Sequence, residues 1–324
     1  TEVSFEQPVL NMSVNLAPQY FVVTGNTSIT SNVTERVELE VHYRSELFKP
    51  AAEEALENAK SIVEYYQSKY GPMSQKRIVI VNSEKIGLWG MAASGYIALG
   101  DAFFNSVIQD PYYVLGRFRE FLLAHEIAHL WSGLKTNIDF HDENFLSEGL
   151  ANYMTYEYLD QKYGYRYSMY DSRSGIMGRL VFYLGAGLGL TPSFRLTEHL
   201  AYHNYVVDGW DEPLKLPRSK SNLAKGGIHD YTKGYLVLNQ LRSYIGGDSF
   251  DRALKSYFQT KSTVFSLDLF KSTVQSKTNL DMDRFFDDWI IKANKIDFSV
   301  TSVDTKSTNE GLQSLVSIQK QGNA

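Results

Sequence analysis

Two histidines four residues apart, with a glutamate further along, constrain the fold of this chain more than any other feature of its sequence. The segment His-Glu-Ile-Ala-His occupies residues 125–129, and Glu148 follows His129 after eighteen intervening residues. On a helix, residues four apart lie on the same face, so His125 and His129 can bind one metal ion. Residues 147–159 also have a helical pattern, which places Glu148 on a second helix. The chain must therefore fold with these two helices face to face.

This donor set predicts one catalytic zinc ion, Zn²⁺, held by His125, His129 and Glu148. Two neutral imidazoles and one carboxylate leave a coordination position open, which is typical of catalytic zinc sites rather than structural ones. Zinc lowers the pKa of a bound water to about 7. Glu126, the next residue after His125, is placed to accept that proton as a general base and to pass it to a leaving amine. The motif alone is a weak signal, but the apolar periodicity of residues 118–124 places it on a helix with one buried side, which we expect to span about 111–134.

The residues around these ligands resemble the aminopeptidase N-type (membrane alanyl aminopeptidase) family of gluzincins. That family has the same eighteen-residue spacing and a tryptophan two positions after the second histidine, which here is Trp131. Its Glu-Gly-x-Ala-x-Tyr run is matched from Glu148 to Tyr153. The resemblance covers roughly residues 45–295. It implies a zinc metallopeptidase, a hydrolase with aminopeptidase-like action on a peptide or protein substrate.

A later motif of the same family, Tyr-x-Lys-Gly, is matched by residues 231–234. The resemblance implies that the hydroxyl of Tyr231 stabilises the oxyanion of the tetrahedral intermediate on the side away from the zinc ion. Losing a donor of this kind typically lowers the rate by about 10²–10³-fold. Asn152, one helical turn after Glu148, either orients a zinc ligand or lies on the helix surface.

The fold that the resemblance implies is α+β, a thermolysin-like zinc peptidase catalytic domain with a small sheet, a mostly helical lobe and flanking β segments. The local patterns agree, since residues 51–69 predict an amphipathic helix and residues 77–81 a short buried strand. We expect three parts, and further domains in the parent protein. These parts are a β segment at 1–44, left from or linking to an N-terminal β domain, the catalytic domain at 45–295, and the truncated start of a C-terminal β-sandwich at 296–324.

The family's Gly-x-Met-Glu-Asn motif is altered in this chain. The matching stretch predicts a substrate-binding edge strand that includes Gly90, Met91, Ala92, Ala93 and Gly95, in which the two alanines stand where Glu and Asn belong. In the family, that glutamate binds the α-amino group of the substrate. A buried ammonium needs an anionic partner, whereas an edge strand can still pair with the main chain of an extended peptide.

Three functions therefore stay open at the level of the sequence. The first is an aminopeptidase N-like zinc peptidase in which another residue anchors the amine. The second is an endopeptidase or oligopeptidase, because Ala92 replaces the amine-anchoring glutamate. The third is a non-catalytic peptide-binding module with the same fold. The complete set of zinc ligands, together with Glu126 and Tyr231, favours an enzyme.

Charge and composition exclude other kinds of partner. The net charge is −5, the pI is about 5.8 and basic residues are not concentrated anywhere, so we expect no nucleic acid. The most apolar stretch, residues 175–190, is short and interrupted by Arg179, so we expect no membrane span within this chain. The chain has no cysteine, which excludes thiolate ligands. The family implies an extracellular or cell-surface location, with a cytoplasmic one as the alternative.

Overall fold

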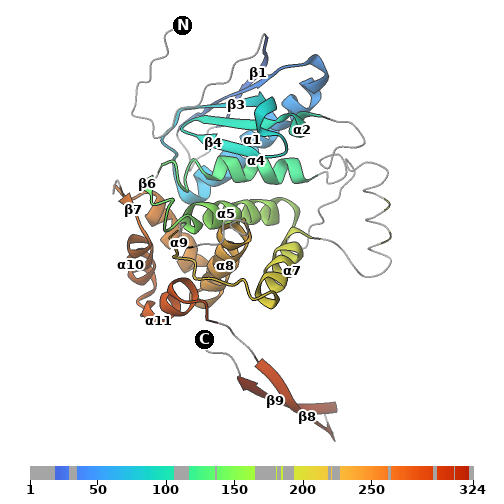
Figure 1. Ribbon diagram of the computed structural model, residues 1–324, viewed down its shortest axis with the longest axis vertical. Coiled ribbons are helices and arrows are strands. Elements are labelled where there is room, and N and C mark those ends of the chain that lie inside the picture. The colour runs from blue at the N-terminus through green and yellow to red at the C-terminus, as the bar shows by residue number, and fades with distance from the viewer. Residues whose placement is uncertain are drawn as a thin grey trace.

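The computed structural model describes a small sheet with a helical lobe beneath it and a separate hairpin (Figure 1). The described residues are 19–28, 35–105, 117–135, 137–164, 180, 184, 193–217, 220, 227–261, 264–294, 298–309 and 311–320. Within these residues, no helix combines the length and the apolar character needed to cross a bilayer.

The sheet has five strands in the spatial order β1-β2-β3-β5-β4. Their bounds are β1 Phe21–Asn26, β2 Glu38–Tyr43, β3 Arg77–Ser83, β4 Gly90–Ala93 and β5 Tyr96–Gly100. β2, β3 and β5 run parallel, whereas β1 and β4 are antiparallel to their neighbours. β4 is therefore an edge strand, paired on one side with β5 through contacts such as Met91 opposite Ala98.

Two helices join this sheet to the lobe. α1 (Lys49–Tyr70) begins with a proline in its first turn and ends at Gly71, whose φ of 88° suits a residue without Cβ. α4 (Phe118–Ala128) lies below the sheet, and α5 (Phe145–Tyr163) lies below α4 (Figure 1). The Tyr66 hydroxyl donates to the Ala124 carbonyl at 3.2 Å and ties α1 to α4. The Trp131 indole donates to the Gly71 carbonyl at 3.0 Å, which fixes the chain just after the His-Glu-x-x-His motif.

The lobe below is mainly helical, built around a core of large aromatic and aliphatic side chains. Its longer helices are α5 Phe145–Tyr163, α7 Phe194–Val207, α8 Gly234–Ile245, α9 Gly247–Phe258 and α10 Leu267–Thr278. The shorter elements of the chain are the helices η1 Glu46–Phe48, η2 Glu84–Ile86, α2 Asp101–Phe104, η4 Ile228–Lys233, α11 Asp283–Phe286 and η5 Asp287–Ile291, and the strands β6 Asn137–Ile138 and β7 Val264–Phe265. η4 and η5 are π-helical. The small sheet and the mostly helical lobe agree with the expected mixed α and β class.

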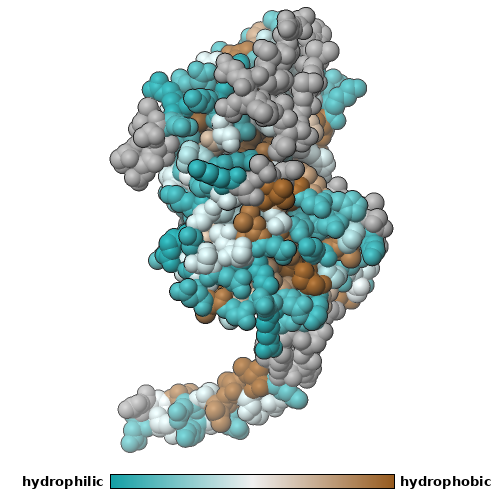
Figure 2. Space-filling view, turned by 90° about the vertical axis from the view of Figure 1, so that its left-hand side faces the viewer, coloured by the Kyte–Doolittle hydropathy of each residue, from teal (hydrophilic) through white to brown (hydrophobic). Residues whose placement is uncertain are grey.

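A two-stranded antiparallel hairpin projects below the lobe (Figure 1). It consists of β8 (Phe298–Thr308) and β9 (Gly311–Lys320). Its apolar residues are exposed, with Val300 at 61% and its cross-strand partner Ile318 at 63%. Figure 2 shows brown apolar side chains on this projection. The assignment of residues 296–324 to a β-sandwich stays a prediction.

Two observations concern boundaries expected from the sequence. The division at residue 44 stays a prediction, but it does not coincide with a break in the sheet, because β2 pairs in parallel with β3 and places Leu39 opposite Ile78. Both side chains are fully buried, so these strands share one core with the catalytic region. For the motif helix, which was expected to cover roughly 111–134, residues 111–116 lie outside the described residues. Its observed end is Ala128, because the chain turns directly after the motif.

Candidate metal centre and cleft

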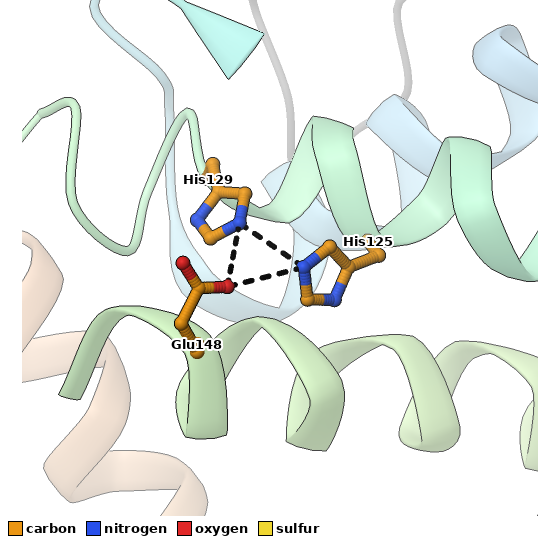
Figure 3. A group of neighbouring side chains, drawn as sticks. All are labelled: His125, His129 and Glu148. Carbon is orange, nitrogen blue, oxygen red and sulfur yellow. Dashed lines mark hydrogen bonds and ion pairs between the residues drawn. The ribbon is translucent and has the colours of Figure 1, made fainter. Parts of the chain in front are cut away.

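Three ligand atoms converge between α4 and α5. The Nε2 atoms of His125 and His129 lie 3.1 Å apart, and Glu148 Oε2 is 3.3 Å from each of them. Figure 3 shows the two imidazoles descending from α4 toward the carboxylate that rises from α5. Glu148 sits in the first turn of α5, where the helix dipole stabilises a carboxylate. Within the described residues, these three side chains form the cluster whose atoms could hold a metal ion.

The Nδ1 atom of each imidazole forms a hydrogen bond on the side of the ring away from the three-residue cluster. His125 Nδ1 lies 2.9 Å from Asn152 Oδ1, and His129 Nδ1 lies 3.0 Å from the Ser132 carbonyl oxygen. Both partners are acceptors, so each Nδ1 carries a proton and each Nε2 points into the centre. This is the ring orientation that metal-binding histidines require.

The residues present fit a zinc ion on electrostatic grounds. Glu148 Oε2 is buried without a hydrogen-bond donor, and the Nε2 atoms of both imidazoles face it at 3.3 Å. Burial alone would lower the pKa of His129, but the adjacent Glu148 carboxylate raises it to about 9. Burial opposes ionisation of Glu148, yet the two imidazoles hold the pKa of its carboxyl well below the usual range. The site therefore favours positive charge at its centre, and the donor set suits Zn²⁺.

Glu126 lines the cleft and lies against Gly90 of β4. It is 5% exposed, and burial raises the pKa of its carboxyl above the usual value. A Cβ atom added to Gly90 would come within 2.5 Å of Glu126 Oε1. The glycine thus allows the main chain of the edge strand to lie directly over this carboxylate. The residue expected to act as general base and the strand expected to bind substrate are therefore adjacent.

Tyr231 enters the cleft from η4. Its ring stacks on His125 with centroids 5.6 Å apart and an interplanar angle of 20°. The side chain is 36% exposed, and its pKa is raised by partial burial and by the nearby Glu148 carboxylate. The phenol is therefore protonated at neutral pH, as a hydrogen-bond donor must be.

Buried contacts on either side of Tyr231 hold η4 in place. The Lys233 ammonium donates to Asp211 at 2.8 Å, and these side chains are 3% and 1% exposed. His229 Nε2 donates to the Pro213 carbonyl at 2.6 Å. Directly before Tyr231 in the chain, the Asp230 carboxylate accepts a hydrogen bond from the Asn144 side-chain amide at 2.7 Å, which connects η4 to the start of α5. The position of the Tyr231 hydroxyl is thus set by tertiary packing.

The cleft has a volume of about 280 Å³, near the lower end for ligand pockets. Its lining comprises Gly90, Met91, Ala92, His125, Glu126, His129, Gly133, Leu134, Phe140, Ser147, Glu148 and Tyr231. Of the expected substrate-binding residues, Ala93 and Gly95 do not line it. Ala93 is 3% exposed, and Gly95 occupies the β4–β5 turn with a φ of 71°.

Leu134, Phe140 and Ser147 are lining residues that the sequence did not reveal. The first two lie on the connection between α4 and α5, which has no periodic pattern to mark a buried or exposed face. Gly133 was the available signal, because its φ of 110° redirects the chain toward the cleft and a Cβ there would meet Ser147 Oγ at 2.5 Å. Leu134 and the 40%-exposed Phe140 give this part of the cleft an apolar wall.

Comparisons with known proteins concern the family that the chain resembles. The model of the peptidase family M1 domain matches residues 51–180, which include all three ligands and Glu126 but not Tyr231. Probable aminopeptidase 1 of Saccharolobus solfataricus is 22% identical over 242 residues, covering 74% of this chain and 28% of the relative. Aminopeptidase N of Rattus norvegicus is 27% identical over 210 residues, covering 58% of this chain and 18% of the relative. The chain thus spans less than a third of these relatives.

Solved structures show the same fold. Aminopeptidase A of Legionella pneumophila, in complex with aspartic acid, superposes with a TM-score of 0.65 at 13% identity, covering 93% of this chain and 31% of that one. A mutant M1 zinc metallopeptidase of Deinococcus radiodurans gives a TM-score of 0.54 at 15% identity, covering 83% and 52%.

Proposed function

The chain belongs to peptidase family M1, and on this premise we propose that it is a zinc-dependent metallopeptidase, aminopeptidase N-like, with a thermolysin-like catalytic domain. The convergence of His125, His129 and Glu148 on one point carries the proposal. Glu126 and Tyr231 line the same cleft and complete a hydrolytic set.

His125, His129 and Glu148 would hold one Zn²⁺. When bound, that ion supplies Lewis-acid activation of a water molecule and of the scissile carbonyl. Glu126 accepts a proton from the attacking water and delivers it to the leaving amine. Tyr231 donates its hydroxyl proton in a hydrogen bond to the carbonyl oxygen as negative charge develops there.

β4 would hold the substrate. Its outer edge is unpaired among the described strands, and its first residues, Gly90, Met91 and Ala92, line the cleft. An extended peptide can add to such an edge by main-chain hydrogen bonds. Because Gly90 lies against Glu126, a peptide paired with β4 has its main chain beside the general base. The apolar wall of Leu134 and Phe140 favours an apolar side chain next to the scissile bond.

An endopeptidase or oligopeptidase is the second candidate, and the charge of the cleft favours it. Among the described lining residues, the carboxylates are Glu126 and Glu148, and both already have roles. Ala92 lines the cleft where the family motif has its acidic residue. A free α-amino group would therefore lie there without a carboxylate partner. A blocked or internal peptide segment avoids this cost.

A non-catalytic peptide-binding module is the third candidate. It requires zinc to be bound without hydrolysis of any peptide. For location, we retain an extracellular or cell-surface site as the proposal and the cytoplasm as the alternative, to be decided by fractionating cells that produce the parent protein.

The deciding experiment compares one decapeptide with a free and with an acetylated N-terminus, incubated with zinc-loaded protein and analysed by mass spectrometry. Glu126→Gln serves as the matched control, because it keeps the zinc ligands and removes the base. We expect hydrolysis by the natural chain and a loss of at least about 10²-fold in the variant.

Each outcome selects one candidate. Release of single residues from the free form alone indicates an aminopeptidase whose amine anchor lies elsewhere than residue 92. Internal cleavage of both forms indicates an endopeptidase. Zinc bound at one equivalent without cleavage of either form would leave the peptide-binding module, and normal turnover by Glu126→Gln would remove Glu126 from the mechanism.

A further inference from the structure

Both polar atoms of the Asn152 side chain form hydrogen bonds. It lies on α5 one turn after Glu148 and is 3% exposed. Its Oδ1 accepts from His125 Nδ1 at 2.9 Å, and its Nδ2 donates to the Tyr231 carbonyl oxygen at 3.2 Å. One amide thus contacts both the helix that carries the zinc ligands and the π-helical segment that carries the oxyanion donor.

Two glycines make this pair of hydrogen bonds, the Asn152 bridge, possible. A Cβ atom added to Gly149 would lie 2.9 Å from the carbonyl carbon of Gly234, so α5 and the start of α8 touch main chain to main chain. Asn152 lies three residues after Gly149, and Tyr231 lies three residues before Gly234. At this close approach, a short amide side chain spans the remaining gap from one element to the other.

The Asn152 bridge holds the His125 ring and the backbone of Tyr231 in fixed positions relative to each other. The two rings stack with their centroids 5.6 Å apart. The Tyr231 carbonyl also accepts the Gly234 amide, so it belongs to the backbone frame of η4 rather than to a loose loop. A change at this carbonyl therefore shifts the segment that places the Tyr231 hydroxyl. Single π-helical turns of this kind occur frequently at functional sites.

Resting on the proposed function, we propose that Asn152 is a positioning residue that couples the place of Tyr231 to the orientation of the zinc ligand His125. Its acceptor end fixes the His125 ring. Its donor end fixes η4 and hence the hydroxyl that Tyr231 directs at the substrate carbonyl.

Asn152→Asp separates the two ends. A carboxylate still accepts from His125 Nδ1, so zinc affinity, measured by competition with a chelator, is retained. The carboxylate cannot donate a hydrogen bond to the Tyr231 carbonyl, and it repels that carbonyl oxygen. We therefore expect kcat for the hydrolysed peptide to fall about 10-fold or more, with little change in KM. The loss in kcat should not exceed the loss caused by Tyr231→Phe. Asn152→Ala removes both ends and should also weaken zinc binding by about 10–100-fold. Asn239→Asp on α8 is the matched control, expected to leave all three quantities unchanged.

A double-mutant cycle tests the coupling itself. If Asn152 acts through Tyr231, Asn152→Asp lowers kcat in the natural chain but causes no further loss in the Tyr231→Phe background. Equal losses in both backgrounds would overturn the proposal, as would natural kcat in Asn152→Asp. These results would assign Asn152 to ligand orientation or general stability.

The same cycle can be measured without turnover, as binding of an acetylated phosphinic alanylalanine analogue to the zinc-loaded protein by calorimetry. If the natural chain hydrolyses no peptide, the proposed function fails. In that case the analogue still tests the coupling. If the losses of analogue affinity caused by Asn152→Asp and Tyr231→Phe add in the double variant, the coupling is overturned, whereas non-additive losses would support it.

Discussion

At the scale of single residues, Gly90 packs tightly against the Glu126 carboxylate. The space that a methyl group would need at residue 90 is occupied by the carboxylate oxygen and by the Cδ and Cγ atoms, at 2.5–2.6 Å. The edge strand can therefore cover the Glu126 carboxylate only because residue 90 lacks a side chain. Residue 92, two positions along the same strand, determines instead whether the cleft offers a charge to an amine.

Gly90→Ala should displace Glu126 or β4 and lower kcat by about 10²-fold, since a misplacement of about 1 Å can have an effect of this size. Zinc content should stay at one equivalent because no ligand moves. The comparison is Gly227→Ala, where an added Cβ would meet no atom within 4 Å. Steady-state kinetics with metal analysis measures both, and unchanged kcat in Gly90→Ala would exclude the close packing.

Tyr231→Phe should lower kcat by about 10²–10³-fold and leave zinc affinity unchanged, because the phenol hydroxyl acts on the substrate oxygen rather than on the metal. Tyr244→Phe, at an exposed tyrosine of α8, is the control. A variant of Tyr231 with natural kcat would remove this residue from the mechanism.

At the scale of elements, η4 depends on contacts with segments far away in the sequence. Its Lys233 pairs with Asp211 in an almost fully buried ion pair, and the lysine also donates to the Glu212 carbonyl at 2.6 Å. The segment around residue 211 therefore braces the helix that presents Tyr231.

Lys233→Met should lower the free energy of unfolding by about 3–5 kcal/mol, because Asp211 is then left buried without its cation. Adding Asp211→Leu should recover much of this loss, since an apolar pair avoids the uncompensated charge. Urea unfolding of the single and double variants measures both effects. Equal stability of Lys233→Met and the natural chain would contradict the burial of this pair.

At the scale of the whole molecule, the candidate metal centre joins the region below the sheet to the helical lobe, since His125 lies on α4, His129 caps the C-terminal end of α4 and Glu148 lies on α5 (Figure 3). An ion bound there requires both parts to be folded. It should therefore stabilise the folded chain as a whole.

Zinc at 100 times its Kd should raise the free energy of unfolding by about 2.7 kcal/mol, and a chelator should lower Tm accordingly. His129→Ala should abolish this dependence on zinc. Differential scanning calorimetry with and without chelator tests the effect, and an identical Tm in both conditions would show that the three ligands do not hold an ion.

The projecting hairpin should contribute little to this stability, because its described residues are almost all exposed. Removing residues 295–324 should leave Tm and kcat close to those of the full chain. A loss of several degrees in Tm would show instead that the hairpin packs on the body.

The sequence alone predicts those features of the fold that depend on residues close together in the chain. Helical spacing placed His125 and His129 on one face, and α1 and β3 were expected within a few residues of their observed bounds. The joining of β1 and β2 to the same sheet was not foreseen, because pairing such as Leu39 with Ile78 depends on residues far apart in the chain.

The sequence by itself determined which residues are candidates for the ligand set and for the general base, and that Ala92 stands where the family motif has an acid, because residue identity and helical or strand periodicity are local properties of the chain. Tertiary structure alone decided that Asn152 contacts both His125 and Tyr231, that Phe140 lines the cleft, and that Gly90 covers Glu126. These contacts depend on how closely separate elements approach, and that distance is set by packing of the whole core.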